Sequence, residues 1–327
     1  MNDLAPRTRR GYSTALKLAV TAGLLAWLLS RANISGIFLA LANARMQWVC
    51  AAFALHFVGL LLSAVRWRLL LRAQGAAVSL SFLSRSLLVG TFFNNFLPST
   101  VGGDLMRARD TAEYAGSKTG ALTVVLVERA SGILVLGFFA LAAPLIGTLG
   151  AGRTATSAQL ATIGLLAGFA ASVLLLRPRP LAALRRNLHR RIVPAAGHRA
   201  VRVLGKADRL LLTLEALARA PGTLRTTFLL ALLLQANVIL HFWCVGQAID
   251  LGVEPGAFLF IVPVATVLLL LPVSINGIGA REAVFAFLLG KYGIPLTQAL
   301  AFSWIAYGTV LLQGVLGGLL YLLRRKL

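Results

Sequence analysis

The chain alternates long apolar runs with short polar segments that are mostly basic. A helix needs about 20 apolar residues to cross a bilayer. Six runs approach or exceed that length, and they cover residues 15–30, 47–65, 119–147, 158–176, 226–249 and 298–323. The pattern predicts an all-α polytopic integral membrane protein with six spanning helices.

Two further apolar stretches are interrupted before they reach a spanning length. The stretch 87–97 stops at Pro98, and the stretch 257–271 stops at Pro272 and resumes over 283–289. Non-helical backbone survives within a bilayer only where protein or a water-filled cavity surrounds it. We therefore expect re-entrant helical hairpins at about 86–115 and 257–290, around a polar interior.

The composition supports the membrane assignment and changes how the charge is interpreted. Hydrophobic residues make up 58% of the chain and charged residues 13%, which excludes a soluble globular protein. The 32 Lys and Arg against 10 Asp and Glu give a net charge of +22, which in a soluble chain would indicate nucleic-acid binding. Here the basic residues flank apolar runs, so membrane orientation explains them and no nucleic-acid partner is expected.

The distribution of basic residues also predicts the topology. If both interrupted stretches return to the side they came from, 26 basic residues fall on one side, twelve of them in the segment 177–225. The positive-inside rule makes that side cytoplasmic and puts both termini there, in a multi-pass protein of the cell (inner) membrane. The segment 177–225 combines these charges with an apolar stripe, so we expect it to lie on the anionic lipids of the inner leaflet. The stripe consists of Leu204, Leu210, Leu211, Leu214 and Leu217.

The predicted order of elements repeats with opposite orientation. Residues 1–150 and 151–327 each give helix, helix, hairpin, helix, the first starting inside and the second outside. In both hairpins an arginine, Arg107 or Arg281, follows nine residues after the proline. This arrangement predicts two membrane repeats related by inverted topology, with a substrate site at their interface.

Charged, polar and glycine residues concentrate at the two hairpins and on the helix after the first. A charge at mid-bilayer costs about 2.5–3.5 kcal/mol, so the charged members must face a cavity or one another. They either form ion pairs that hold the hairpins, or use arginine to grip a phosphate while glycines let its oxygens approach the backbone. The candidate substrate-binding residues are Asn94, Asn95, Pro98, Ser99, Thr100, Gly102, Gly103, Asp104, Arg107, Glu128, Arg129, Pro272, Ser274, Asn276, Gly277, Gly279, Arg281 and Glu282.

Enzymatic and structural roles remain as alternatives. An intramembrane transferase or phosphatase acting on phospholipid or polyprenyl phosphates would use Asp104, Asp110 and Glu113 as metal ligands, near Arg107 and Arg109. A membrane scaffold would use the basic segment to recruit partners. The spacing of cysteines and histidines suggests neither a metal site nor a cofactor, and no catalytic residue is assigned.

Three segments resemble the lysylphosphatidylglycerol synthase transmembrane, or flippase-like, family: Asn94–Arg107, Val127–Gly132 and Leu271–Glu282. That family includes the membrane half of multiple peptide resistance factor, which is held to move aminoacylated phosphatidylglycerol between leaflets, and standalone relatives. The resemblance implies a translocator of a phosphate-bearing lipid, with Arg107, Arg129 and Arg281 meeting the phosphate. Because the chain ends at Leu327, we expect no soluble aminoacyltransferase half and no lipid synthesis. A second copy of the chain or a separate lipid-modifying enzyme remain as partners.

Overall fold

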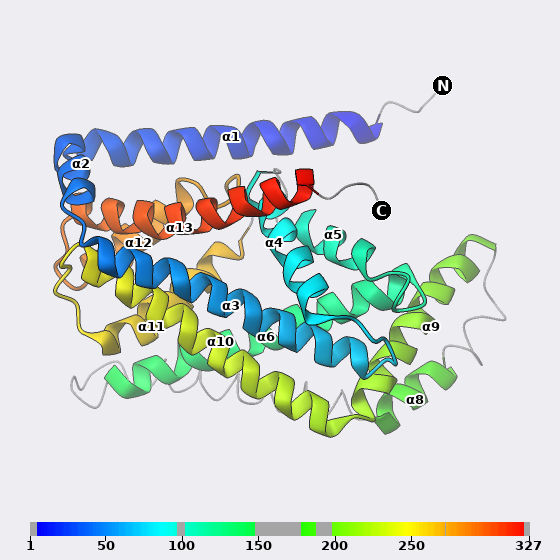
Figure 1. Cartoon of the computed structure of the whole chain (residues 1–327). Helices are drawn as coiled ribbons and strands as arrows, with labels where there is room; N and C mark the ends of the chain where they lie inside the picture. Colours follow the sequence, from blue (N-terminus) through cyan, green and yellow to red (C-terminus); the bar gives the residue numbers. More distant parts are fainter. Residues whose placement is uncertain (1–4, 97–101, 148–177, 188–197, 272, 324–327) are drawn as a thin grey trace. The chain divides into compact units, whose positions relative to one another are not determined.

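The structure is a computed structural model that describes residues 5–96, 102–147, 178–187, 198–271 and 273–323, and every regular element in these ranges is an α-helix (Figure 1). The helices are α1 (Ala5–Arg31), α2 (Ile34–Ala42), α3 (Met46–Arg72), α4 (Leu80–Phe96), α5 (Gly102–Asp110), α6 (Lys118–Gly147), α8 (Pro178–Asn187), α9 (His198–Ala218), α10 (Pro221–Ala248), α11 (Pro255–Leu269), α12 (Ala280–Gly290) and α13 (Leu296–Leu323). The all-helical prediction is confirmed over the described residues.

Four described helices are long and apolar enough to cross a membrane: α3, α6 over Lys118–Gly137, α10 and α13. They coincide with four of the six predicted runs. The first run forms the C-terminal part of α1, which with α2 makes a pair bent by 87° that counts as a fifth span if it crosses as one unit. The run 158–176 and the boundary between residues 150 and 151 lie outside the described residues. The count of six and the inverted repeat therefore stay predictions.

Each predicted hairpin contains two separate helices. In the first, α4 and α5 flank residues 97–101, which lie outside the described residues. In the second, α11 is an apolar helix of 15 residues, too short to cross, and it packs against α12. Whether these segments re-enter the membrane stays a prediction, because no membrane is present.

Local sequence explains where several helices begin and end. The side chain of Asn33 accepts the Gly36 N–H ahead of α2, and the Ser117 hydroxyl accepts the Gly120 N–H at the start of α6. α3 ends at Arg72, and the turn after it contains Gly75, whose φ of +82° suits glycine. α3 extends beyond the predicted apolar run 47–65 and continues as a helix to Arg72.

The chain divides into two compact units, each built from segments distant in sequence. Unit 1 comprises Met1–His56, Asn94–Thr100 and Val238–Gln313, and unit 2 comprises Phe57–Phe93, Val101–Asn237 and Gly314–Leu327. We describe each unit by itself.

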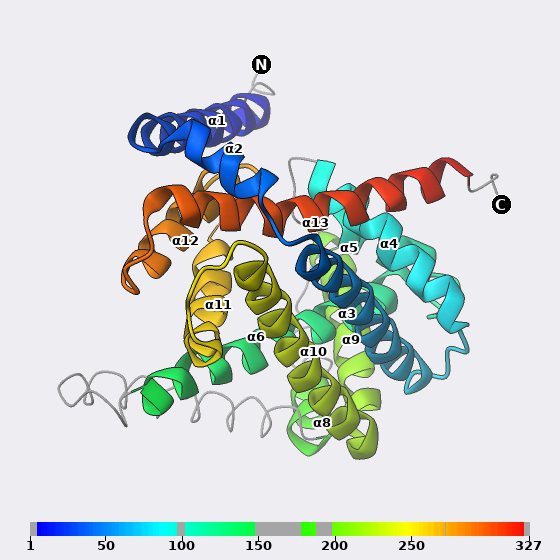
Figure 2. The same cartoon turned by 60° about the vertical axis from the view of Figure 1, so that its left-hand side comes forward.

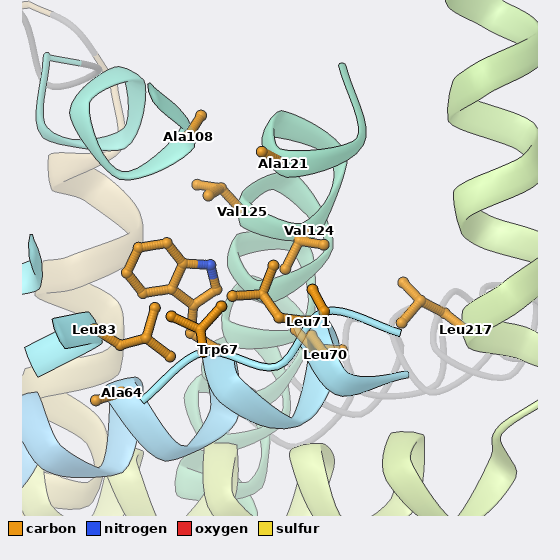
Figure 3. Packing of buried hydrophobic residues seen from close by; sticks show 12 residues of the cluster. Ala64, Trp67, Leu70, Leu71, Leu83, Ala108, Ala121, Val124, Val125 and Leu217 are labelled. Atoms are coloured by element: carbon orange, nitrogen blue, oxygen red, sulfur yellow. The ribbon is translucent and has the colours of Figure 1, made fainter. Parts of the chain in front are cut away.

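The core of unit 2 surrounds Trp67, which is fully buried on α3. Figure 3 shows its indole ring among Leu83 of α4, Leu71 of α3 and Val125 of α6. Leu217 of α9 joins the same core from the segment predicted to be a basic loop. Residues from four helices thus fix α3 and α6 in this unit.

In the described residues of the segment 177–225, α8 and α9 lie side by side (Figures 1 and 2), and residues 221–225 begin α10. Leu211 and Ala218 of α9 pack against Leu181 of α8, and the buried Glu215 lies 3.4 Å from Arg185. Since Leu211 and Leu217 are buried within unit 2, these members of the apolar stripe contact protein. Contact of the segment with inner-leaflet lipid stays a prediction.

In unit 1, α12 packs against α1 and α11. Phe285 of α12 contacts Phe242 of α10 and Phe302 of α13, with ring centroids 5.2 Å apart in both pairs. This aromatic packing positions the helix that carries Arg281 and Glu282.

Candidate functional site

The predicted site residues gather in two clusters, one in each unit. The α5–α6 cluster in unit 2 consists of Arg66, Trp67, Asp104, Arg107, Glu128 and Arg129. The α12 cluster in unit 1 lies around Arg281, where the chain leaves the loop 270–279 and enters α12.

Ion pairs dominate the α5–α6 cluster. Arg107 of α5 pairs through Nη2 with Glu128 of α6, and Arg129 of α6 pairs through Nε with Asp104 of α5. A further contact of 3.7 Å joins Arg107 to Asp104. Asp104, Arg107 and Glu128 are buried, so these pairs fasten α5 to α6 away from solvent.

Arg66 and Trp67 belong to this cluster, although sequence reasoning did not assign them to it. The Arg66 guanidinium, only 2% exposed, donates through Nη2 to the Glu128 carbonyl oxygen at 3.0 Å and to Ser131 Oγ at 2.8 Å. The Trp67 ring lies 4.4 Å from the Arg107 guanidinium, in the geometry of a cation–π contact. Arg66 therefore has a role in the interior of unit 2 and is not simply an orientation charge.

The two helices of the first hairpin touch within unit 2. Ser86 of α4 donates to Asp110 Oδ2 of α5 at 2.6 Å. A Cβ added to Gly90 would come within 3.3 Å of the Gly103 carbonyl oxygen, so α4 approaches α5 closely at a glycine.

The enzyme alternative needs acidic residues arranged to share a metal ion. Within the described part of the chain, no three His, Cys, Asp or Glu side chains are so placed. Asp104 is held by two arginines and Asp110 by Ser86, so both carboxylates already have partners.

The loop before α12 takes backbone conformations that favour glycine. Asn276, Gly277 and Gly279 have φ of +53°, +76° and +80°. The loop is tied down from two sides, because Ile275 N donates to Thr21 Oγ1 at 3.1 Å and Asn276 Nδ2 donates to the Asn95 carbonyl at 2.7 Å. Predicted site residues Asn95 and Asn276 are thus brought together.

Arg281 projects back over this loop. Its Nη2 donates to the Asn276 carbonyl oxygen at 2.9 Å, and its guanidinium carbon lies 3.9 Å from the centre of the Tyr307 ring. Tyr307 on α13 was not predicted as a site residue. The sequence offers no signal for it beyond its position within the last apolar run, nine residues after that run starts. No ion pair of Arg281 with a carboxylate occurs among the described residues.

Glu282 forms no salt bridge with Arg281 in the described residues; instead, its carboxylate caps the start of α12. Its Oε2 accepts the Gly279 N–H at 2.6 Å, and its Oε1 lies 3.4 Å from the Ser303 hydroxyl. A carboxylate in the first turn also interacts favourably with the positive end of the helix dipole. The Gly279 N–H is therefore occupied in this conformation.

Three enclosed polar atoms of the loop 270–279 and the start of α12 have no hydrogen-bond partner among the described residues. They are Arg281 Nη1, Asn276 Oδ1 and Ser274 Oγ. An enclosed polar group without a partner costs free energy, so a donor and an acceptor left together are suited to a ligand that supplies the missing partners.

The remaining predicted residues are placed as follows. Gly102 is the first residue of α5, Gly103 is buried in the same helix, and Asn94 lies on α4. A Cβ added to Gly277 would lie 3.3 Å from Arg281 Nη2. Pro98, Ser99, Thr100 and Pro272 lie outside the described residues.

Comparison with known proteins agrees with the apolar helices and with the motifs. No curated protein and no solved structure matches the chain. The family model described as lysylphosphatidylglycerol synthase TM region matches residues 14–318, nearly the whole chain. Together with its long apolar helices, this match shows that the chain is a multi-pass membrane protein belonging to the lysylphosphatidylglycerol synthase TM region family.

Proposed function

We propose that the protein is a translocator that moves a phosphate-bearing lipid between the leaflets, with the head-group phosphate bound by Arg281. The single observation that carries this proposal is that the Arg281 guanidinium is held in place but keeps a donor that has no partner among the described residues. It is oriented by Asn276 and Tyr307, no salt bridge joins it to a carboxylate in the described residues, and its Nη1 has no hydrogen-bond acceptor there.

The chemistry of the loop fits a phosphate. A guanidinium offers donors in a planar fork that matches two phosphate oxygens. On the loop before α12, the Ser274 hydroxyl can donate to a further oxygen, and Asn276 Oδ1 can accept from a hydroxyl or amine of the head group. The acyl or prenyl chains would remain in the bilayer while the head group occupies the polar site.

The arginines of the two clusters differ in their availability. Arg107 and Arg129 are each paired with a carboxylate, so a phosphate reaching them must compete with Asp104 or Glu128. Arg281 needs no such exchange. We therefore place the primary phosphate contact at Arg281 and assign the ion pairs of the α5–α6 cluster to holding α5 on α6.

Reconstitution in liposomes tests the proposal. Head-group-labelled anionic lipid is followed by its accessibility to a membrane-impermeant quencher, in vesicles containing wild type, Arg281→Gln or Lys291→Gln. Lys291 is an exposed cation of the same unit, so its substitution removes equal charge without touching the site. We expect wild type and Lys291→Gln to accelerate lipid exchange and Arg281→Gln to lose most of the acceleration.

Two results would contradict the proposal. One is equal exchange in protein-containing and empty vesicles. The other is chemical conversion of the lipid, detected by mass spectrometry, which would favour the enzyme alternative.

For the basic helices α8 and α9, we retain the proposal that they lie on the anionic inner leaflet. Since part of their apolar stripe is buried in unit 2, the exposed charges rather than the leucines would make the contact. The exposed cations in the described residues of this segment are Arg179, Arg186, Arg219 and Arg225.

A further inference from the structure

The α5–α6 cluster contains more positive than negative charge. Its contacts join three guanidiniums, those of Arg66, Arg107 and Arg129, to two carboxylates, those of Asp104 and Glu128. Both carboxylates are engaged by Arg107 and Arg129. Arg66, the most buried arginine of the cluster, donates to Glu128 at its backbone carbonyl, and within the described ranges no salt bridge joins Arg66 to a carboxylate.

The unsatisfied groups of the cluster are all donors. Arg66 Nε, Arg107 Nε and Trp67 Nε1 are enclosed and have no hydrogen-bond partner among the described residues. Arg66 and Arg107 converge on Glu128, one at its carbonyl and one at its carboxylate, and Arg107 lies over the Trp67 ring. Three unpartnered donors beside an excess of positive charge suit a ligand that is negative and only accepts hydrogen bonds.

One member of the cluster provides an approach from outside. The Arg129 side chain is 43% exposed, whereas those of Asp104, Arg107 and Glu128 are below 10%. Arg129 is therefore the member of the cluster whose guanidinium an anion can contact from outside. The α12 cluster differs, because there the unsatisfied groups include the acceptor Asn276 Oδ1.

We propose that unit 2 contains a second anion site, centred on Arg66 with Arg107 and Trp67, that binds a phosphodiester oxyanion. A phosphodiester carries one negative charge and presents only acceptors, which matches the donors left unsatisfied here. The site depends neither on Arg281 nor on translocation. The phosphodiester comes either from a lipid head group or from a soluble compound.

Binding of dimethyl phosphate, a water-soluble phosphodiester without lipid chains, tests the site. The full chain carrying Arg281→Gln is purified into nanodiscs of neutral lipid, which removes the α12 site from the measurement. Its melting temperature is followed during titration with sodium dimethyl phosphate and with sodium chloride at equal ionic strength. A ligand at free concentration L that binds only the folded state stabilises it by RT ln(1 + L/Kd), so the rise in melting temperature with concentration gives the apparent affinity.

We expect dimethyl phosphate to stabilise this variant beyond the effect of chloride. Adding Arg66→Gln should weaken the apparent affinity about tenfold or more, because a charge-assisted contact is lost. Adding Arg72→Gln, which removes an exposed arginine from the same helix, should leave the affinity unchanged. Arg66→Lys keeps the charge but not the Nε donor, and it replaces Arg66→Gln if that variant does not fold.

A second series of nanodiscs, containing phosphatidylglycerol without dimethyl phosphate, identifies the source. Stabilisation by phosphatidylglycerol that disappears with Arg66→Gln supports a lipid head group, and a response to dimethyl phosphate alone supports a soluble phosphodiester. The proposal is overturned if neither compound stabilises the Arg281→Gln variant more than chloride does. It is also overturned if Arg66→Gln and Arg72→Gln respond alike.

Discussion

Removing the carboxylate of Glu128 should destabilise the protein more than the loss of any exposed ion pair. In Glu128→Gln the buried Arg107 loses its closest partner and must share Asp104, 3.7 Å away, with Arg129. The cluster then holds three guanidiniums and one carboxylate. Breaking a buried pair by removing one partner costs about 3–5 kcal/mol, so we expect a loss of that size in the free energy of unfolding.

A double-mutant cycle separates the pair from the rest of the cluster. Unfolding by SDS titration in mixed micelles is measured for Glu128→Gln, for Arg107→Gln and for the two combined. Because the second substitution removes the charge stranded by the first, the combined variant should lose less stability than the sum of the single variants, with a coupling of about 2 kcal/mol.

The exposed pair Arg45–Asp250 is the matched control. Its N–O distance is 2.9 Å, but its side chains are 51% and 72% exposed, so a cycle of Arg45→Gln and Asp250→Asn should give a coupling of about 0–1 kcal/mol. Equal couplings in the two cycles, or a Glu128→Gln variant as stable as wild type, would refute the assignment of the buried pair to fastening α5 on α6.

Three further outcomes are expected. A cysteine at Glu113, in a chain whose two native cysteines are serines, should react with an impermeant maleimide only after the cytoplasmic side is opened; labelling of intact cells from outside would contradict the topology. Gly317→Ala should lower stability in SDS titration by about 1–3 kcal/mol, because its Cβ would overlap a backbone carbonyl of α4, whereas Gly308→Ala, in open space, should cost nothing. Tyr307→Leu should slow lipid exchange about fivefold by releasing the Arg281 guanidinium, and Tyr307→Phe, which keeps the ring, should retain most of the activity.

Hydropathy predicted the long helices well because it depends only on residues adjacent in the chain. The runs 47–65, 119–147, 226–249 and 298–323 are all helical in the structure. The helix ends agree with the ends of these runs to within five residues, except at the end of α3. The largest difference is that α3 continues to Arg72, seven residues beyond the predicted run, and the sequence contains the signal for this continuation. Leu69, Leu70 and Leu71 continue the apolar run after Arg66, and the first helix-stopping glycine is Gly75.

Partners of the buried charges could not be predicted in the same way. Sequence identified Asp104, Arg107, Glu128 and Arg129 as costly within a membrane, but ion pairing and ligand binding satisfy that cost equally well. The choice depends on how α5 packs on α6, which no local pattern encodes. Arg66 was missed for the opposite reason, since a basic residue at the end of an apolar run is ordinarily explained by orientation alone.

The two short helices α5 and α12 place their charges in a way that changes what the glycines before them do. The sequence suggested that free backbone N–H groups at these helix starts would hold the phosphate. In α12, however, Glu282 already accepts the Gly279 N–H, and in α5 the first-turn Asp104 lies at the same end of the helix. A carboxylate there repels an anion, so the donors for a phosphate come from the Arg281 side chain. Gly279 is then required for its φ of +80° and for its closeness to the Thr21 carbonyl, which makes it a residue that shapes the loop rather than one that binds substrate.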